Sequence, residues 1–148
     1  MIEYLLVFLG GAIPWLEIGL VIPVGIVGGL SPVWVIIAAF AGNLITVLVV
    51  IFGYQKFKVW RESRNGKNEK AESKRTERGK RIWNKYGMPG LALVGPILIG
   101  THIAAFIGLF FGASKTNTTV WMTLSIAVWS LIFGVVTAMG FNFFVSTS

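Results

Sequence analysis

Apolar residues dominate four long stretches of the chain, 5–30, 33–54, 88–112 and 118–145, and polar residues separate them. The second and fourth stretches contain no acidic residue, lysine, arginine or histidine. A helix over 33–54 would be about 33 Å long, and the hydrocarbon core of a bilayer is about 30 Å thick. The pattern therefore predicts an all-α integral membrane protein in which these two stretches each cross the bilayer.

The first and third apolar stretches contain helix breakers. Proline removes a backbone donor and clashes with the preceding turn, and a carbonyl freed inside a membrane needs protein or water around it. The candidate breakers are Pro14, Pro23, Pro96, Gly19 and Gly100. Each stretch could cross as a kinked helix, or form a re-entrant hairpin of two half-helices, each about 10 residues and about 15 Å long. We favour the re-entrant hairpin.

The same order of parts occurs twice. A broken stretch precedes the clean stretch that opens near Trp34, and another precedes the clean stretch that opens near Trp121. With re-entrant hairpins each half crosses the bilayer once, so the halves have opposite orientations and form inverted repeats, whose paired broken segments indicate a midplane transport site. We predict one membrane domain, 1–148, with repeat one at 1–55, a basic loop at 56–86 and repeat two at 87–148. The alternative is a four-helix protein with parallel repeats.

Positive charge is concentrated in one loop. Residues 56–85 contain twelve of the chain's thirteen Lys and Arg and four of its six acids. Short loops rich in Lys and Arg stay in the cytoplasm, so 56–86 is predicted to be cytoplasmic in a multi-pass protein of the inner or plasma membrane. Aromatic residues frame the loop, as at a membrane interface: Phe57, Trp60, Trp83 and Tyr86. A topology signal is the favoured interpretation, with a site for nucleic acid or anionic lipid as the alternative.

Composition excludes several other classes of protein. The chain is 55% hydrophobic and 13% charged, with a mean hydropathy of +0.75, whereas soluble domains are about 25% charged. Without cysteine there is no disulfide framework, and the single histidine and scattered acids show no metal-ligand spacing. The first residues have no basic region or cleavage site, so no signal peptide is predicted. We find no catalytic motif and expect neither an enzyme, nor a cofactor, nor a nucleic-acid partner.

Two ionisable residues in the broken stretches are candidates for proton coupling. A charge at the centre of a membrane segment costs about 2.5–3.5 kcal/mol, and acids at such depth usually face a cavity and mark a pathway. Glu17 occupies such a position, so we expect it to gain and lose a proton as substrate moves. His102 has roughly the corresponding place in the second half and could relay protons or pair with Glu17. Alternatively, Glu17 is solvated at the rim and His102 is structural.

Other polar and aromatic residues could contact a substrate. Trp15, beside Pro14, could stack on a cationic or amphipathic molecule, or anchor the chain at the interface. Thr101 precedes His102, and Asn43 lies in the middle of a clean apolar stretch. For Asn43, a hydrogen bond between helices is the favoured role and substrate contact is the alternative.

Three stretches together resemble a known family: GGAIPWLEIGLVIPVG, AAFAGN and KYGMPGLALVGPILIGTHIAAFIG. Over nearly its whole length the chain resembles the small multi-drug export protein family of bacteria and archaea. That family is similar in plan to the DedA/VTT membrane proteins, which have re-entrant hairpins, an acid in the first and basic residues in the second, and are implicated in moving lipids such as polyprenyl phosphate. The resemblance implies that Glu17 is the acid of the first hairpin. Residues 88–112 contain no arginine, only His102, which argues against a phosphate-lipid substrate.

These observations favour a transporter of an amphipathic molecule, either a lipid or a drug-like compound, coupled to protons through Glu17. One alternative is a four-helix drug/proton antiporter resembling the small multidrug resistance proteins. Another is a membrane scaffold whose broken segments only pack together. The expected partners are the bilayer, the amphipathic substrate, protons and, from the small size of the chain, a second copy in a homodimer.

Overall fold

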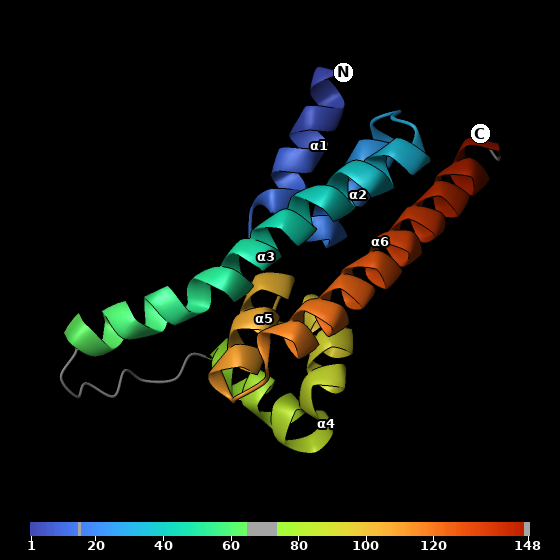
Figure 1. Cartoon of the computed structure of the whole chain (residues 1–148). Coiled ribbons are helices and arrows are strands. Elements are labelled where there is room, and N and C mark those ends of the chain that lie inside the picture. Colours follow the sequence, from blue (N-terminus) through green and yellow to red (C-terminus); the bar gives the residue numbers. More distant parts are fainter. Residues whose placement is uncertain (15, 65–73, 147–148) are drawn as a thin grey trace. The chain divides into compact units, whose positions relative to one another are not determined.

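The computed structural model describes residues 1–14, 16–64 and 74–146, and within these ranges all regular structure is helical (Figure 1). This confirms the predicted all-α class. The helices are α1 (Ile2–Ala12), α2 (Glu17–Val27), α3 (Pro32–Arg64), α4 (Lys74–Leu98), α5 (Thr101–Phe110) and α6 (Lys115–Ser146).

Two short helical segments precede each of the two long helices, α3 and α6. α1 and α2 have 11 residues each and precede the 33-residue α3. α4 is interrupted at Gly87, whose φ of 68° and ψ of −155° are not helical, so 88–98 forms a separate short segment. This segment and the 10-residue α5 precede the 32-residue α6. Two short helices followed by one long helix therefore occur twice in the chain order.

The two short pairs end in the same backbone motif. After α2, Leu30 N–H donates to the Gly25 carbonyl oxygen at 3.1 Å, and Gly29 has a φ of 88°. After α5, Ala113 N–H donates to the Gly108 carbonyl oxygen at 2.9 Å, and Gly112 has a φ of 104°. This is the left-handed glycine cap that commonly ends a helix, because glycine adopts positive φ without a steric penalty. The shared motif fixes the register in which the two halves correspond.

Contacts divide the chain into two compact units: residues 1–46 with 123–148, and residues 47–122. In the first unit, α1 and α2 pack antiparallel, since Gly10 faces Val21 while Gly25 lies against Val7. The backbone N–H of Ser31, just after this pair, donates to the Tyr4 hydroxyl oxygen at 3.2 Å. The outer ends of the pair therefore lie side by side.

The first unit also brings α1 against α3 at small residues. A Cβ atom on Gly11 would lie 2.7 Å from the Ala39 carbonyl oxygen, and one on Gly42 would overlap the Phe8 carbonyl. Such close backbone approach is typical of helix contacts between small residues in membranes. Glycine at these two positions is thus required by packing.

In the second unit, 88–98 of α4 packs antiparallel to α5. Gly95 faces Ala104 and Gly108 faces Met88. The core around this pair is made of buried apolar side chains, including Leu91, Ala92, Ile107 and Met122.

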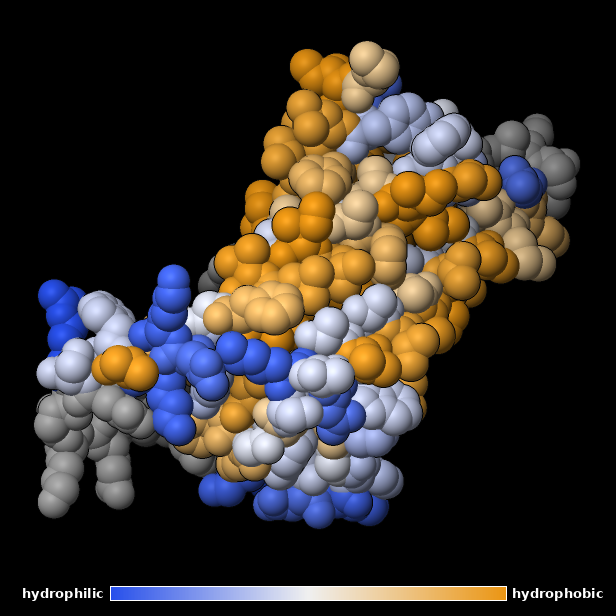
Figure 2. Space-filling view, viewed as in Figure 1, coloured by the Kyte–Doolittle hydropathy of each residue, from blue (hydrophilic) through white to orange (hydrophobic). Residues whose placement is uncertain are grey.

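Within the described residues, two helices are long and apolar enough to cross a membrane. These spans are Pro32–Trp60 in α3, with a mean hydropathy of 2.7, and Lys115–Gly140 in α6, with a mean hydropathy of 2.0. Both predicted crossing stretches therefore lie in long helices. Apolar side chains such as Val49 and Val136 are about two-thirds exposed, and Figure 2 shows apolar surface over much of the face in view. Such a surface suits acyl chains and indicates a membrane location.

The helix breaks differ in detail from those expected. α1 ends before Pro14, as predicted, but α2 continues through Pro23 and α4 continues through Pro96. The second pair is broken at Gly100, one of the predicted breakers, which has a φ of 98°. Proline only removes a donor and disfavours the preceding turn, and packing against neighbours can hold such a helix together. A positive φ, in contrast, ends the helix.

The charged region is also more helical than a connecting loop. α3 continues to Arg64 and α4 begins at Lys74, so most of 56–86 extends two helices. Residues 65–73, the middle of the predicted loop, lie outside the described residues.

Candidate substrate site

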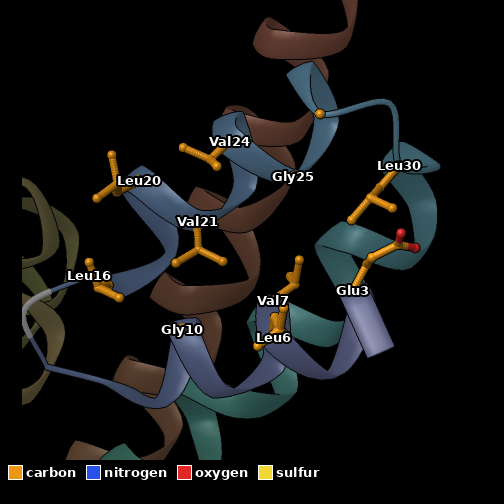
Figure 3. A pocket seen from close by; sticks show the side chains of 11 residues that line it. Glu3, Leu6, Val7, Gly10, Leu16, Leu20, Val21, Val24, Gly25 and Leu30 are labelled. Atoms are coloured by element: carbon orange, nitrogen blue, oxygen red, sulfur yellow. The ribbon is translucent and has the colours of Figure 1, made fainter. Parts of the chain in front are cut away.

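A groove of about 360 Å³ runs between α1 and α2 (Figure 3). Apolar side chains and glycines line most of it, and the only charged group among its lining residues is a carboxylate. The lining residues are Glu3, Leu6, Val7, Gly10, Leu16, Leu20, Val21, Val24, Gly25, Gly28 and Leu30. Figure 3 shows Glu3 at one end, beside Leu30, and Leu16 at the opposite end. Sites for small molecules are commonly apolar concavities with few polar groups, so the groove is a candidate binding site.

Glycines bring the two walls close together at the base of the groove. A Cβ atom on Gly10 would lie 2.9 Å from a methyl carbon of Val21. Towards the opening, Leu6, Leu20 and Val24 are exposed at the surface. The groove is therefore narrow beside Gly10 and open, with exposed apolar side chains, along its rim.

Glu3 gives the groove its polarity. It lies in the first turn of α1 and is exposed. A carboxylate is favourable there because a helix N-terminus carries partial positive charge. Sequence reasoning did not single out Glu3 as a site residue. The sequence feature that could have indicated it is an acid in the first turn of an apolar helix. Only the pairing of α1 with α2 shows that Glu3 lines a groove.

Glu17 begins α2 in an unusual conformation. It is half-buried, with a φ of 43°, a value that residues other than glycine seldom adopt. Its backbone N–H donates to the Ile13 carbonyl oxygen at 3.2 Å. Glu17 does not line the groove, but its neighbour Leu16 does. The predicted acid therefore lies at the turn between the groove's two walls.

The other predicted residues near this turn have different surroundings. Pro14 is exposed in the turn, and Trp15 lies outside the described residues. Gly19 is exposed, and a Cβ atom there would touch the Phe133 ring at 3.5 Å. Pro23 is half-buried within α2. None of the four described positions here, Glu17 included, lines the groove.

Asn43 joins α3 to the end of α1. Its side chain is fully buried, and its Nδ2 donates to the Gly11 carbonyl oxygen at 3.0 Å. The last carbonyls of a helix have no partner within the helix, so this bond satisfies one of them. Such a bond between helices is the favoured role from the sequence. The other side-chain atom, Oδ1, has no hydrogen-bond partner, and Asn43 does not line the groove.

Thr101 and His102 open α5 in the second unit. Both are buried, and Thr101 Oγ1 lies 3.2 Å from His102 Nδ1. Gly100, which precedes them, matches Glu17 in the register set by the glycine caps, and both have positive φ. His102 thus follows the point equivalent to Glu17 by two residues. A functional pairing of Glu17 with His102 stays a prediction.

Short paired helices and two long apolar helices indicate a helical membrane protein, and the apolar groove is its candidate binding site. The family described as "Putative small multi-drug export protein" matches residues 17–132, and the chain belongs to this family. The match begins at Glu17, so α1 and Glu3 lie before it. No curated protein and no solved structure matches the chain.

Proposed function

We propose that the chain exports an amphipathic molecule, lipid or drug-like, and holds its apolar part in the groove between α1 and α2. The observation that carries the proposal is the groove itself, apolar along its length with Glu3 at one end. A polar or cationic head would lie at Glu3, because a carboxylate attracts cations and accepts hydrogen bonds. Family membership supports export over catalysis.

We further propose that α1 and α2 form a re-entrant hairpin. Each has 11 residues, so each is about 16 Å long, about half of a hydrocarbon core. Their antiparallel packing and the bond between Ser31 and Tyr4 support an entry and an exit at one face. The equivalent pair in the second half, with the same glycine cap, supports inverted repeats around a cytoplasmic 56–86.

Glu17 is the proposed coupling group. A non-glycine residue with positive φ stores strain, and such strain occurs often at functional sites. Glu17 combines this strain with a carboxyl group at the tip of the proposed hairpin, next to Leu16 of the groove. Protonation there would change the charge at the tip and so alter the turn that joins the two walls. His102 is proposed to relay protons in the second half.

Flux through purified protein in liposomes tests the proposed function. The probes are tetraphenylphosphonium, a lipophilic cation, and a fluorescent phospholipid, each measured with and without a pH gradient. Movement of either probe above protein-free liposomes, changed by the gradient, supports a proton-coupled exporter and separates drug-like from lipid cargo. If neither probe moves, with a gradient or without one, the scaffold alternative replaces the proposal.

A further inference from the structure

The first half of α4, residues 74–86, has one face packed against α5. A Cβ atom on Gly79 would overlap the side chain of Ile107, so the two helices are in close contact there. One turn further along, the Trp83 ring stacks on Phe111 with centroids 6.0 Å apart and planes at 21°. Gly79 and Trp83 therefore fix how this part of α4 is rotated.

The opposite face of the same segment carries three exposed cations. Arg78, Arg81 and Lys85 are spaced by three and four residues, which places them on one side of a helix. They span about 10 Å along the axis, at about 1.5 Å per residue. Because the packed face fixes the rotation of the helix, this stripe is held outward. Figure 2 shows hydrophilic residues gathered over α4 and the end of α3.

The depth of the stripe follows from the break at Gly87. Charged residues precede it, and the apolar segment 88–98 follows it directly. Aromatic rings cluster next to it, with centroids of contacting rings 5.3–6.5 Å apart. Successive contacts link Trp83, Phe111, Phe110 and Phe106, and Phe57 and Tyr54 each contact Phe106. Tryptophan and tyrosine are enriched at membrane–water interfaces, and Trp83 and Tyr54 belong to this cluster. The stripe is thus placed where lipid phosphates lie.

We infer that Arg78, Arg81 and Lys85 form a binding surface for the phosphate groups of anionic phospholipids. Guanidinium groups bind phosphate through paired, charge-assisted hydrogen bonds, and a lysine adds a third cation. Basic clusters directly next to a membrane segment are attracted to anionic leaflets. Nucleic acid fits less well, because the apolar segment beginning at Met88 holds the stripe against the bilayer.

A topology signal alone needs no such arrangement. The positive-inside rule depends on the number of cations near a span, and not on which face of a helix they occupy. The end of α3 offers the comparison, since Lys56, Lys58 and Arg64 are also exposed there. Residues 55–60 are all exposed, and the ring of Phe57 touches Phe106, but Lys56, Lys58 and Arg64 are spaced by two and six residues and do not share one face of the helix.

The test measures the thermal stability of the full chain in neutral detergent with added phosphatidylglycerol or phosphatidylcholine. The α4 variant is Arg78→Gln, Arg81→Gln and Lys85→Gln. The matched control, Lys56→Gln, Lys58→Gln and Arg64→Gln, removes the same charge. We expect phosphatidylglycerol to stabilise the wild type and the control at similar concentrations. For the α4 variant, the phosphatidylglycerol concentration needed for the same stabilisation should rise by up to about a hundredfold. Each lost cation removes about 1 kcal/mol of attraction to the anionic lipid.

Equal losses in both variants would show diffuse charge attraction and overturn the inference. It would also fail if inorganic phosphate or a duplex RNA oligonucleotide stabilised the wild type as strongly as phosphatidylglycerol. Should the triple variant fail to fold, Arg81→Gln alone is compared with Lys58→Gln, and Arg81→Lys should recover part of the loss. Equal behaviour of Arg81→Gln and Lys58→Gln would again contradict a built surface.

Discussion

Glu17 and Gly100 both have a positive φ at equivalent points of two pairs of helices. Their φ values are 43° and 98°, and each stands where the second short helix of its pair begins. Glycine adopts positive φ freely, whereas another residue pays about 1–2 kcal/mol. Strained residues occur often at functional sites, so Glu17 is a candidate functional residue.

The backbone strain at Glu17 can be separated from its chemistry. Glu17→Gly should leave stability unchanged or raise it by up to about 1 kcal/mol, because relief of strain exceeds the extra freedom of glycine in the unfolded chain. Glu17→Ala keeps the strain and serves as the control. Unfolding in mixed detergent micelles provides the measurement, and a Glu17→Gly variant less stable than Glu17→Ala would contradict a strained turn.

The carboxyl group of Glu17 should set the pH dependence of transport. Glu17→Gln keeps the size and shape of the side chain but cannot release a proton. We expect it to insert and fold normally and to lose pH-gradient-driven flux in liposomes. Gradient-driven flux at the wild-type rate would contradict proton coupling through Glu17. It would not contradict transport through the groove.

His102 should have a smaller effect than Glu17. It is buried beside Thr101, whose Oγ1 lies 3.2 Å from its Nδ1. His102→Ala is expected to shift the pH optimum of flux or slow it severalfold. If the pH profile is unchanged and only stability falls, His102 has a structural role.

The contact between α1 and α3 should tolerate no side chain at Gly42. A methyl group there would overlap the Phe8 backbone, whereas one at Gly53 has no atom within 4 Å. Gly42→Ala should therefore lower the free energy of unfolding by about 1–3 kcal/mol, the usual cost of overpacking. Gly53→Ala, in the same helix, should raise it by up to about 1 kcal/mol because alanine favours helix. Similar values for the two variants would contradict the close packing of α1.

Labelling of single cysteines tests the re-entrant hairpin, since the chain has no native cysteine. Ile2→Cys and Ser31→Cys should react with an impermeant maleimide from one face, and a cysteine at Lys67 from the other. If 5–30 crosses the bilayer once, positions 2 and 31 will react from opposite faces. That result would favour the four-helix antiporter.

Sequence patterns predicted the helical class, the two long spans and the broken stretches, because apolar length and helix breakers are local properties. They did not predict that α2 continues through Pro23 or that α4 continues through Pro96, since neighbouring helices decide whether a proline is tolerated. Asn43 was predicted to bond between helices, but not its partner, the carbonyl of Gly11.

The groove could not be predicted from the sequence. It arises because Gly10 and Gly25 let α1 and α2 approach each other, which places Glu3 at one end of the apolar groove. Which face of α4 points outward likewise depends on the contact of Gly79 with Ile107. Hydrophobic periodicity in the sequence does not predict this contact between helices. Both features depend on which helices pair.

Filling the groove with a large side chain tests most directly the claim that substrate is transported through it. Val24 lines it and is 62% exposed, while Val27 lies in the same helix, is 58% exposed and is outside the groove. Tryptophan at either position should be accommodated without disturbing the core. Flux of tetraphenylphosphonium or the fluorescent phospholipid in liposomes, whichever the wild type moves, should fall at least about tenfold in Val24→Trp and stay near wild type in Val27→Trp, as expected for a loss of about 1.4 kcal/mol or more in binding. Equal flux in the two variants would contradict transport through this groove.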